Sequence, residues 1–220
     1  MTPTFPARAY DTGGARTAER VRTLYLFERP AAVLLLVLLS PVMLAVAVAV
    51  FLLSQRGPLV AHNRVGWRGT PFAMLKFRTM WAGGPAHSPF FSIENVGGLQ
   101  GGAKTMSDPR VTSRFAAFCR RYSVDELPQL WHVARGEMSL VGPRPLTINE
   151  LREHYGSAMP EVLSLRPGLT GLWQSMGRSR LSYAQRRRLD LLLARRMSAG
   201  MYFAILVRSV PKLLAGEDAY

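Results

Sequence analysis

A single cysteine, Cys119, stands among the 220 residues, so no disulfide can form within the chain. Its apolar neighbours Phe115 and Phe118 favour a small packed side chain over a reactive thiol. The chain has no His/Cys metal cluster, because its four histidines are scattered: His62, His87, His132 and His154. A glycine-rich phosphate loop of the Lys-Ser/Thr kind and a nucleophile elbow are also missing. Acids and arginines therefore remain as the candidates for chemistry.

Acidic residues are scarce, with 14 against 28 basic residues and a formal net charge of +14. Such a charge attracts nucleic acid, anionic lipid or phosphorylated substrates, and does not choose among them. Residues 1–30 are rich in Arg, Pro, Gly and Thr and lack a secretory signal pattern. With 48% hydrophobic residues, the chain can form one compact domain, or a smaller core with a membrane element.

Charged residues are absent from residues 31–53, so this segment has the length of a membrane helix. Pro41 near its middle removes a backbone hydrogen bond and predicts a kink, while the Ser40 hydroxyl can bond a freed carbonyl. The arms on either side would be roughly 14 and 18 Å long, each too short for a hydrocarbon core of about 30 Å. A straight single-pass anchor is the alternative.

Basic residues flank this segment on both sides, so the positive-inside rule gives no preferred direction. They are Arg8, Arg16, Arg20, Arg22 and Arg29 before it, and Arg56, Arg64, Arg68, Lys76 and Arg78 after it. A re-entrant helix that breaks at Ser40-Pro41 would keep both flanks on the cytoplasmic side. We therefore favour the re-entrant interpretation over a true span.

The remaining sequence predicts a small α+β domain that is predominantly helical. Residues 58–62 and 72–78 indicate a short β-hairpin, and the glycine-rich residues 81–107 indicate a long loop. Helices are predicted over 113–121 and 126–133, with Ser123 as an N-cap and Gly136 as a C-cap.

Two basic amphipathic helices are predicted near the C-terminus, over 181–196 and 201–214. They are either core-facing helices with solvated basic edges or interfacial helices on the membrane surface.

The adjacent acids Asp125 and Glu126 stand out in this basic chain. One interpretation is a capped helix start whose acids pair with surface arginines. The other is a catalytic site, in which arginines keep a carboxylate ionised as a nucleophile toward phosphorus. The second carboxylate could then bind Mg²⁺, which screens the charge of a phosphorylated substrate.

Arginines that could bind phosphate lie nearby in sequence or in rigid turns. Arg120 precedes Asp125 by five residues, and Arg178 follows Gly177. Arg144 stands between Pro143 and Pro145, which hold the backbone near an extended conformation and limit the entropy lost on binding. A rigid loop corner without a ligand is the alternative for this last segment.

Five ordered motifs resemble those of the bacterial sugar transferases, the monotopic phosphoglycosyl transferase family, over residues 28–201. They are Lys76-Phe-Arg-Thr-Met80, Asp108-Pro-Arg-Val-Thr112, Ser123-Val-Asp-Glu-Leu-Pro-Gln-Leu130, Gly136-Glu-Met-Ser-Leu-Val-Gly-Pro-Arg-Pro145 and Pro167-Gly-Leu-Thr-Gly171. The chain is similar to the short form of that family, and the family's broken membrane helix has a Ser-Pro pair at the position of Ser40-Pro41.

The resemblance implies that Asp125 attacks the β-phosphate of a UDP-sugar and releases UMP, after which polyprenyl (undecaprenyl) phosphate accepts the phosphosugar. It implies that Glu126 binds Mg²⁺, that Arg120 and Arg178 contact phosphate, and that Pro143-Arg144-Pro145 shapes the floor of the site. Pro143, Pro145, Lys76 and Arg78 would shape the site. The expected location is the cytoplasmic face of the bacterial inner membrane, in an early step of glycoconjugate synthesis such as exopolysaccharide production.

Five residues, in three parts of the chain, depart from the family pattern. Leu24, Tyr25 and Glu28 stand where a basic pair and an Asp are usual, Ala116 replaces a Gly, and Tyr202 replaces an acidic residue. The altered N-terminal residues put the interfacial anchor in doubt, with Arg22 or Arg29 as substitutes. The sugar is not readable, because residues 81–107 and the tail are the variable parts.

The predicted organisation is a flexible arm over 1–27, a re-entrant membrane helix over 28–56 and a cytosolic, membrane-associated catalytic domain over 57–220. The expected partners are UDP-sugar, polyprenyl phosphate and membrane lipids, without nucleic acid; a homo-oligomer is left open. Two competing hypotheses are a membrane-anchored polyanion-binding module without catalysis and a hydrolase in which water resolves the aspartyl intermediate.

Overall fold

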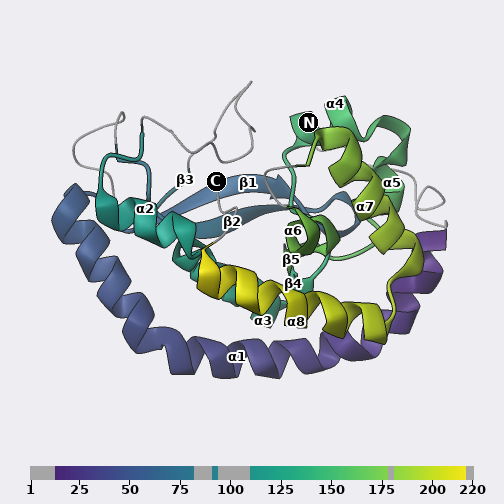
Figure 1. Cartoon of the computed structure of the whole chain (residues 1–220), viewed down its shortest axis with the longest axis horizontal. Coiled ribbons are helices and arrows are strands. Elements are labelled where there is room, and N and C mark those ends of the chain that lie inside the picture. Colours follow the sequence, from purple (N-terminus) through teal and green to yellow (C-terminus); the bar gives the residue numbers. More distant parts are fainter. Residues whose placement is uncertain (1–12, 82–90, 94–109, 178–180, 217–220) are drawn as a thin grey trace.

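The computed structural model describes residues 13–81, 91–93, 110–177 and 181–216. One long helix runs beneath a small sheet and a group of shorter helices (Figure 1). The elements in chain order are α1 (Gly13–Ser54), β1 (Leu59–Val65), η2 (Trp67–Gly69), β2 (Pro71–Phe77), β3 (Phe91–Ile93), α2 (Arg114–Arg121), η3 (Val124–Gln129), α3 (Leu130–Arg135), β4 (Ser139–Val141), α4 (Ile148–His154), η4 (Gly156–Ala158), α5 (Met159–Val162), β5 (Gly168–Thr170), α6 (Leu172–Met176), α7 (Tyr183–Arg196) and α8 (Ala199–Ala215). The predominantly helical α+β class predicted from the sequence is confirmed.

Helix α1 is continuous through the Ser40-Pro41 pair and is bowed rather than interrupted (Figure 1). Pro41 has no N–H to offer the carbonyl four residues earlier, and the Ser40 hydroxyl donates a hydrogen bond to that carbonyl, Val37 O, at 2.7 Å. The expected help from the Ser40 hydroxyl is therefore present. The helix is not broken at this point, because the helical backbone is continuous from Gly13 to Ser54.

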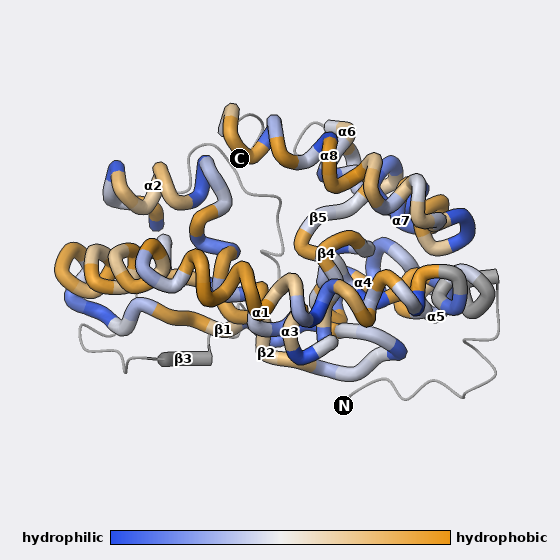
Figure 2. The backbone as a smooth tube through the Cα atoms, turned by 90° about the horizontal axis from the view of Figure 1, so that it is seen from below, coloured by the Kyte–Doolittle hydropathy of each residue, from blue (hydrophilic) through white to orange (hydrophobic). Residues whose placement is uncertain are grey.

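Most of α1 is apolar and exposed. Residues 21–54 form a helix with the length and hydropathy needed to cross a membrane, and only 11% of its most apolar window is buried inside the protein. The tube of α1 is largely coloured as hydrophobic in Figure 2. A helix in water would bury such a surface, so this one requires an apolar environment.

The start of α1 lies inside the stretch predicted as a flexible arm. The helix begins at Gly13, and Val21 and Tyr25 are buried in a cluster with residues of α7 and α8. The Thr17 hydroxyl donates to the Arg195 carbonyl oxygen at 2.9 Å. These contacts give residues 17–25 a tertiary partner, which local sequence patterns do not reveal.

Both halves of α1 pack against the same globular body. In the first half Ala32 is fully buried with Val133 of α3 and Met138. In the second half Val46 and Val50 pack against Phe77 of β2 and against the buried Cys119 of α2. The apolar segment between these contacts is therefore held at both ends by one body.

The predicted hairpin is confirmed, with β1 and β2 antiparallel and paired from Leu59↔Phe77 to Val65↔Pro71. The turn between them uses left-handed backbone at Arg68 and Gly69, with φ of 53° and 81°. The predicted loop over 81–107 is wrong at residues 91–93, because β3 adds to β1 in parallel. The rest of that loop, apart from residue 81, lies outside the described residues.

Strands β4 and β5 form a two-stranded parallel sheet in which the backbone approaches itself at glycines. A Cβ built on Gly168 would lie 2.0 Å from the backbone nitrogen of Gly142, and one built on Gly171 would lie 2.4 Å from the Gly142 oxygen. No side chain fits in that space. This crossing leads directly into the Pro143-Arg144-Pro145 segment.

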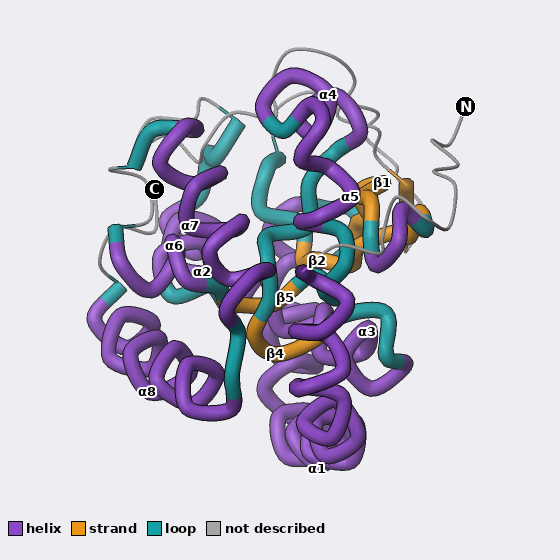
Figure 3. The backbone as a smooth tube through the Cα atoms, turned by 90° about the vertical axis from the view of Figure 1, so that its right-hand side faces the viewer, coloured by secondary structure: helices purple, strands orange, loops and turns teal. Residues whose placement is uncertain are grey.

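The two predicted C-terminal helices are confirmed as α7 and α8 (Figure 3). Helix α7 starts with a capping box between Ser182 and Gln185 and buries Leu193. Helix α8 buries Ile205 on one face and exposes apolar side chains on the other, including Val207, which is 70% exposed. Helix α8 thus keeps an uncovered apolar face, whereas α7 turns its leucines mainly inward.

Candidate active site

The acid pair lies on η3, directly after α2. The chain turns at Ser123, whose φ of 55° is left-handed and whose side chain makes no capping hydrogen bond, so the predicted N-cap role is wrong. The predicted single helix over 126–133 is instead a 3₁₀ segment up to Gln129 followed by α3. Pro128 has no N–H to extend an α-helical ladder, which favours the shorter 3₁₀ turn. Gly136 ends α3 with a φ of 78°, as predicted.

Asp125 is 2% exposed, and Glu126 makes an ion pair with Lys76 of β2 at 2.7 Å. The side chains of Glu126 and Lys76 are 17% and 11% exposed. A capped helix start with surface pairing would leave its acids in solvent, so the burial favours a built site. The hairpin thus brings Lys76 to the acid pair across 50 residues of sequence.

Arg120 projects from the last turn of α2 and is 3% exposed. Its Nη2 has no hydrogen-bond partner within the described part of the chain. Burial, followed by the negative charge of Asp125, raises the pKa of the neighbouring Cys119 thiol to about 11. Cys119 is therefore a packed, protonated side chain, as its sequence neighbours indicate, and the α2–η3 corner holds Asp125 beside it.

Arg78 and Lys76 come from the same end of β2 and serve different purposes. The Arg78 Nε donates to the Gly57 carbonyl oxygen at 2.8 Å, and its backbone N–H donates to Pro58 O at 2.8 Å. Arg78 is 3% exposed, so it fixes the chain that leaves α1 for β1. This contact orients the hairpin strand on which Lys76 lies.

The Pro143-Arg144-Pro145 segment is held from both sides by backbone hydrogen bonds. Pro143 O accepts from the Gly168 N–H at 2.8 Å, and Leu146 O accepts from the Val65 N–H at 2.9 Å. Both prolines are buried, whereas Arg144 is half-buried. The Arg144 guanidinium carbon lies 6.0 Å from the centroid of the Trp173 ring. The segment is therefore a rigid corner that carries one arginine.

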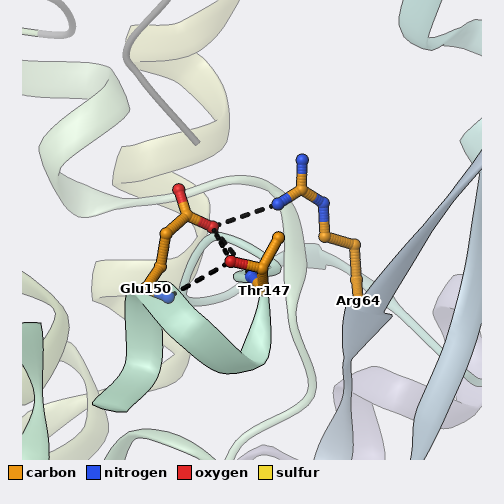
Figure 4. A network of polar contacts seen from close by, with 3 residues as sticks. All are labelled: Arg64, Thr147 and Glu150. Carbon is orange, nitrogen blue, oxygen red and sulfur yellow. Dashed lines mark hydrogen bonds and ion pairs between the residues drawn. The ribbon is translucent and has the colours of Figure 1, made fainter. Parts of the chain in front are cut away.

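Arg178, the third predicted phosphate ligand, lies outside the described residues. The structure brings together Lys76 and Glu126, and α2 places Arg120 next to the η3 turn. The sequence did not reveal that Arg64 of β1 pairs with Glu150 of α4 at 3.1 Å. Figure 4 shows the same Glu150 oxygen accepting from the Thr147 backbone N–H and hydroxyl. The only local sequence signal for the contacts of Glu150 was the Thr-x-x-Glu spacing, which predicts the capping box between Thr147 and Glu150.

His132 was also missed as a positioning residue. Its Nε2 accepts the backbone N–H of Leu75 at 3.1 Å, and its Nδ1 lies 2.6 Å from a Glu137 oxygen. A backbone N–H can only donate, so Nε2 carries no proton and Nδ1 donates to Glu137. This bridge fixes β2 one residue before Lys76 and therefore helps to aim Lys76 at Glu126.

His62 lies on β1 two residues from Arg64. Burial, followed by the positive charges of Lys76, Arg64 and two further arginines, lowers the pKa of His62 to about 3. The ring is thus neutral at physiological pH. A neutral imidazole beside several cations can donate or accept a hydrogen bond without adding charge.

The described residues contain no group of three or more His, Cys, Asp or Glu side chains suited to a metal ion. Mg²⁺, however, is commonly bound by one or two carboxylates together with substrate phosphates and water. The adjacent carboxylates of Asp125 and Glu126 fit that pattern. Lys76 would have to share or yield its place beside Glu126 when a metal binds.

The site residues described above all lie in the part of the chain that matches known proteins. The profile of the family described as bacterial sugar transferase matches residues 21–216. Exopolysaccharide production protein ExoY of Rhizobium meliloti (strain 1021) is 39% identical over 197 residues, which cover 88% of this chain and 86% of that protein. UDP-glucose:undecaprenyl-phosphate glucose-1-phosphate transferase of Caulobacter vibrioides is 38% identical over 201 residues, with coverages of 86% and 69%.

A third relative, undecaprenyl-phosphate galactose phosphotransferase of Salmonella typhimurium, is 34% identical over 202 residues, which cover 88% of this chain and 41% of that protein. The matched region holds both the apolar part of α1 and the acid pair with its basic neighbours. The chain therefore belongs to the bacterial sugar transferase family.

Proposed function

We propose that the protein transfers a phosphosugar from a UDP-sugar to polyprenyl phosphate and releases UMP. The observation that carries this proposal is a buried Asp125 next to a Glu126–Lys76 ion pair, in the part of the protein that packs against the second half of the exposed apolar helix α1. The names of two relatives, which include undecaprenyl-phosphate, support the lipid acceptor, and the name of one includes UDP-glucose. In this proposal the Asp125 carboxylate takes part in both steps: it receives the phosphosugar from the soluble donor and passes it to the lipid acceptor.

In the proposed first step an Asp125 carboxylate oxygen attacks the β-phosphorus of the donor. A bond forms from that oxygen to phosphorus, and the bond from the β-phosphorus to the bridging oxygen breaks, so the electron pair leaves with UMP. In the second step an oxygen of polyprenyl phosphate attacks the same phosphorus and restores the Asp125 carboxylate. Arg120 and Arg144 are placed to bind the phosphate oxygens, because forked guanidiniums match that geometry.

Glu126 is the proposed magnesium ligand, and a bound Mg²⁺ would screen the repulsion between the Asp125 carboxylate and the anionic donor. Lys76 holds Glu126 in place before the donor arrives and adds a positive charge to the site. Exclusion of water from the buried Asp125 disfavours hydrolysis of the aspartyl intermediate. This is the physical reason to rank a transferase above a hydrolase.

We also propose that α1 enters and leaves the same face of the membrane. A spanning helix would place its ends on opposite sides of the bilayer, yet Ala32 and Val50 pack into the same globular body. The Ser40 hydroxyl satisfies the carbonyl that Pro41 frees at the bow of the helix. Helix α8 would lie at the interface with its exposed apolar face toward lipid, on the cytoplasmic side.

The activity is tested with the full chain in lipid nanodiscs, with Mg²⁺, undecaprenyl phosphate and a panel of UDP-sugars. We expect UMP release from at least one donor and none from Asp125→Asn. The matched control is Glu153→Gln, whose side chain is 74% exposed. Normal turnover by Asp125→Asn would contradict the proposal.

Omission of the lipid separates the competing functions. A transferase stops after one UMP per protein, and a hydrolase continues. A polyanion-binding module releases no UMP and shows steeply salt-dependent binding that is the same in Asp125→Asn.

The topology is tested by labelling cysteines in a Cys119→Ser background. Arg22→Cys lies before the apolar segment, and Thr70→Cys lies in the exposed turn of the hairpin. A membrane-impermeant maleimide added to inside-out vesicles should label both positions. Labelling of the two positions from opposite sides would refute re-entry without affecting the chemistry.

A further inference from the structure

Three arginines from three separate elements lie near the proline-flanked corner, where the Val65 N–H next to Arg64 donates to Leu146 O at 2.9 Å. They are Arg64 of β1, Arg144 of the proline-flanked corner and Arg186 of α7. Arg186 and Arg144 share one aromatic surface, because their guanidinium carbons lie 4.8 and 6.0 Å from the centroid of the Trp173 ring. Burial and then the charge of Arg144 lower the pKa of Arg64. Like charges this close are unfavourable unless an anion joins them.

Two carboxylates, Glu150 and Asp190, lie beside these arginines. Glu150 bonds Arg64 at 3.1 Å, and the same oxygen is also taken up in capping α4 (Figure 4). Asp190 is fully buried and accepts the Tyr155 hydroxyl at 2.6 Å. Burial raises the pKa of Asp190 to about 7, so it is only partly ionised at neutral pH. Asp190 therefore offers Arg186 less than a full counter-charge at neutral pH.

The cluster adjoins the catalytic acids. The negative charge of Glu126 reaches Arg64, as does the positive charge of Arg144. Glu126 follows Asp125 directly and pairs with Lys76, which lies on the strand next to that of Arg64. Arg64 is therefore close enough to the acid pair to interact with it electrostatically, and a diphosphate held at Asp125 is expected to extend in this direction.

We propose that Arg64 and Arg186 join Arg144 to bind the phosphate that stays with the nucleoside when Asp125 displaces it from the sugar phosphate. This inference rests on the proposed function. As the bond to the bridging oxygen breaks, its electron pair adds negative charge to the departing UMP phosphate. Fixed guanidiniums stabilise that charge, and they do so more strongly in a partly buried site than in water.

The ligand chemistry is a phosphate monoester, which the acceptor lipid also carries. The position of the cluster favours the nucleotide. In Figure 1, α7 begins beside α4, on the side of the body away from the exposed apolar helices α1 and α8, and then runs down to meet them. A phosphate on a lipid chain would have to reach across the body from the apolar side, whereas a nucleotide arrives from water.

The test measures binding of UMP, uridine and farnesyl phosphate to the full chain in nanodiscs by calorimetry. Arg186→Gln should weaken UMP binding about tenfold or more, because a charge-assisted hydrogen bond is lost, and should leave uridine binding unchanged. The matched control is Arg188→Gln, two residues further along α7 and exposed, which should bind UMP as the wild type does.

Unchanged UMP binding by Arg186→Gln would overturn the assignment. A loss confined to farnesyl phosphate would move the cluster to the acceptor, and an equal loss for uridine would show a general collapse of the site; either result also refutes the proposal. Arg186→Lys is the second variant if Arg186→Gln does not fold, with an expected loss of about three- to tenfold since the fork is replaced by a point charge. Wild-type protein that binds UMP without turning over any UDP-sugar would reject the proposed function alone.

Discussion

Glu28 connects the long apolar helix α1 to the rest of the protein through one carboxylate oxygen. Its Oε1 accepts the Ser139 hydroxyl at 2.6 Å, the Leu140 N–H at 3.0 Å and the Tyr202 hydroxyl. Its Oε2 has no hydrogen-bond partner in the described part of the chain. A Gln at this position can keep all three bonds through its carbonyl oxygen, whereas an Ala keeps none.

The magnitude follows from what each substitution leaves unpaired. The Ser139 hydroxyl has a second acceptor in Val141 O at 2.9 Å. Glu28→Ala therefore leaves two donors without an acceptor, the Leu140 N–H and the Tyr202 hydroxyl. Each costs about 1–3 kcal/mol, and we expect Glu28→Ala to lose about 3–4 kcal/mol. Glu28→Gln removes a buried charge but places an amide NH₂ where Oε2 has no partner, so it should cost about 1–2 kcal/mol, less than Glu28→Ala.

The assay is thermal unfolding in nanodiscs, followed by circular dichroism. Glu28→Ala should lower Tm by about 10 °C for a chain of this size. The matched control, Glu19→Ala on the same helix, removes a carboxylate that is 74% exposed and should leave Tm unchanged. If Glu28→Gln were as damaging as Glu28→Ala, the negative charge rather than the acceptor would matter, and the reasoning would be wrong.

Three further predictions concern the site and its supports. Lys76→Met should reduce kcat for UMP release by about tenfold or more by leaving Glu126 without its partner, and Lys76→Arg should recover part of it. Asp190 is protonated more readily in the folded than in the unfolded chain, since its pKa rises from 3.8 to about 7, so its contribution to stability is complete below pH 3.8 and is lost as pH rises to 7. Asp190→Asn should therefore flatten the fall of Tm between pH 4 and 8, and an unchanged slope would reject this account. Gly168→Ala places a methyl group 2.0 Å from Gly142 N and should cost more than about 3 kcal/mol in urea unfolding; a smaller loss would show that the crossing can open.

Elements with a strong local pattern could be predicted from the sequence. The hairpin, α2, α7 and α8 follow from periodicity and turn residues, and Gly136 ends α3 where a left-handed residue is needed. The acid pair was recognisable because few other acids compete with it. Local patterns succeed at these positions because the interactions involved span only a few residues.

The remaining contacts depend on residues far apart in the chain. Glu28 and Tyr202 each depart from the family pattern, and the structure shows that they are two sides of one contact across 174 residues. Arg64 and Glu150 pair across 86 residues. No local signal in either segment identifies its partner, so neither pairing could be deduced before the fold was known.

The glycine crossing between β4 and β5 affects how freely the neighbouring surface can change. Backbone touches backbone at Gly142, Gly168 and Gly171, and the Arg144 corner continues directly from that contact. The position of Arg144 is therefore set by main-chain geometry rather than by the size of surrounding side chains. Substitutions in the side chains around it can accumulate without displacing this arginine, whereas one methyl group at the crossing would misplace it.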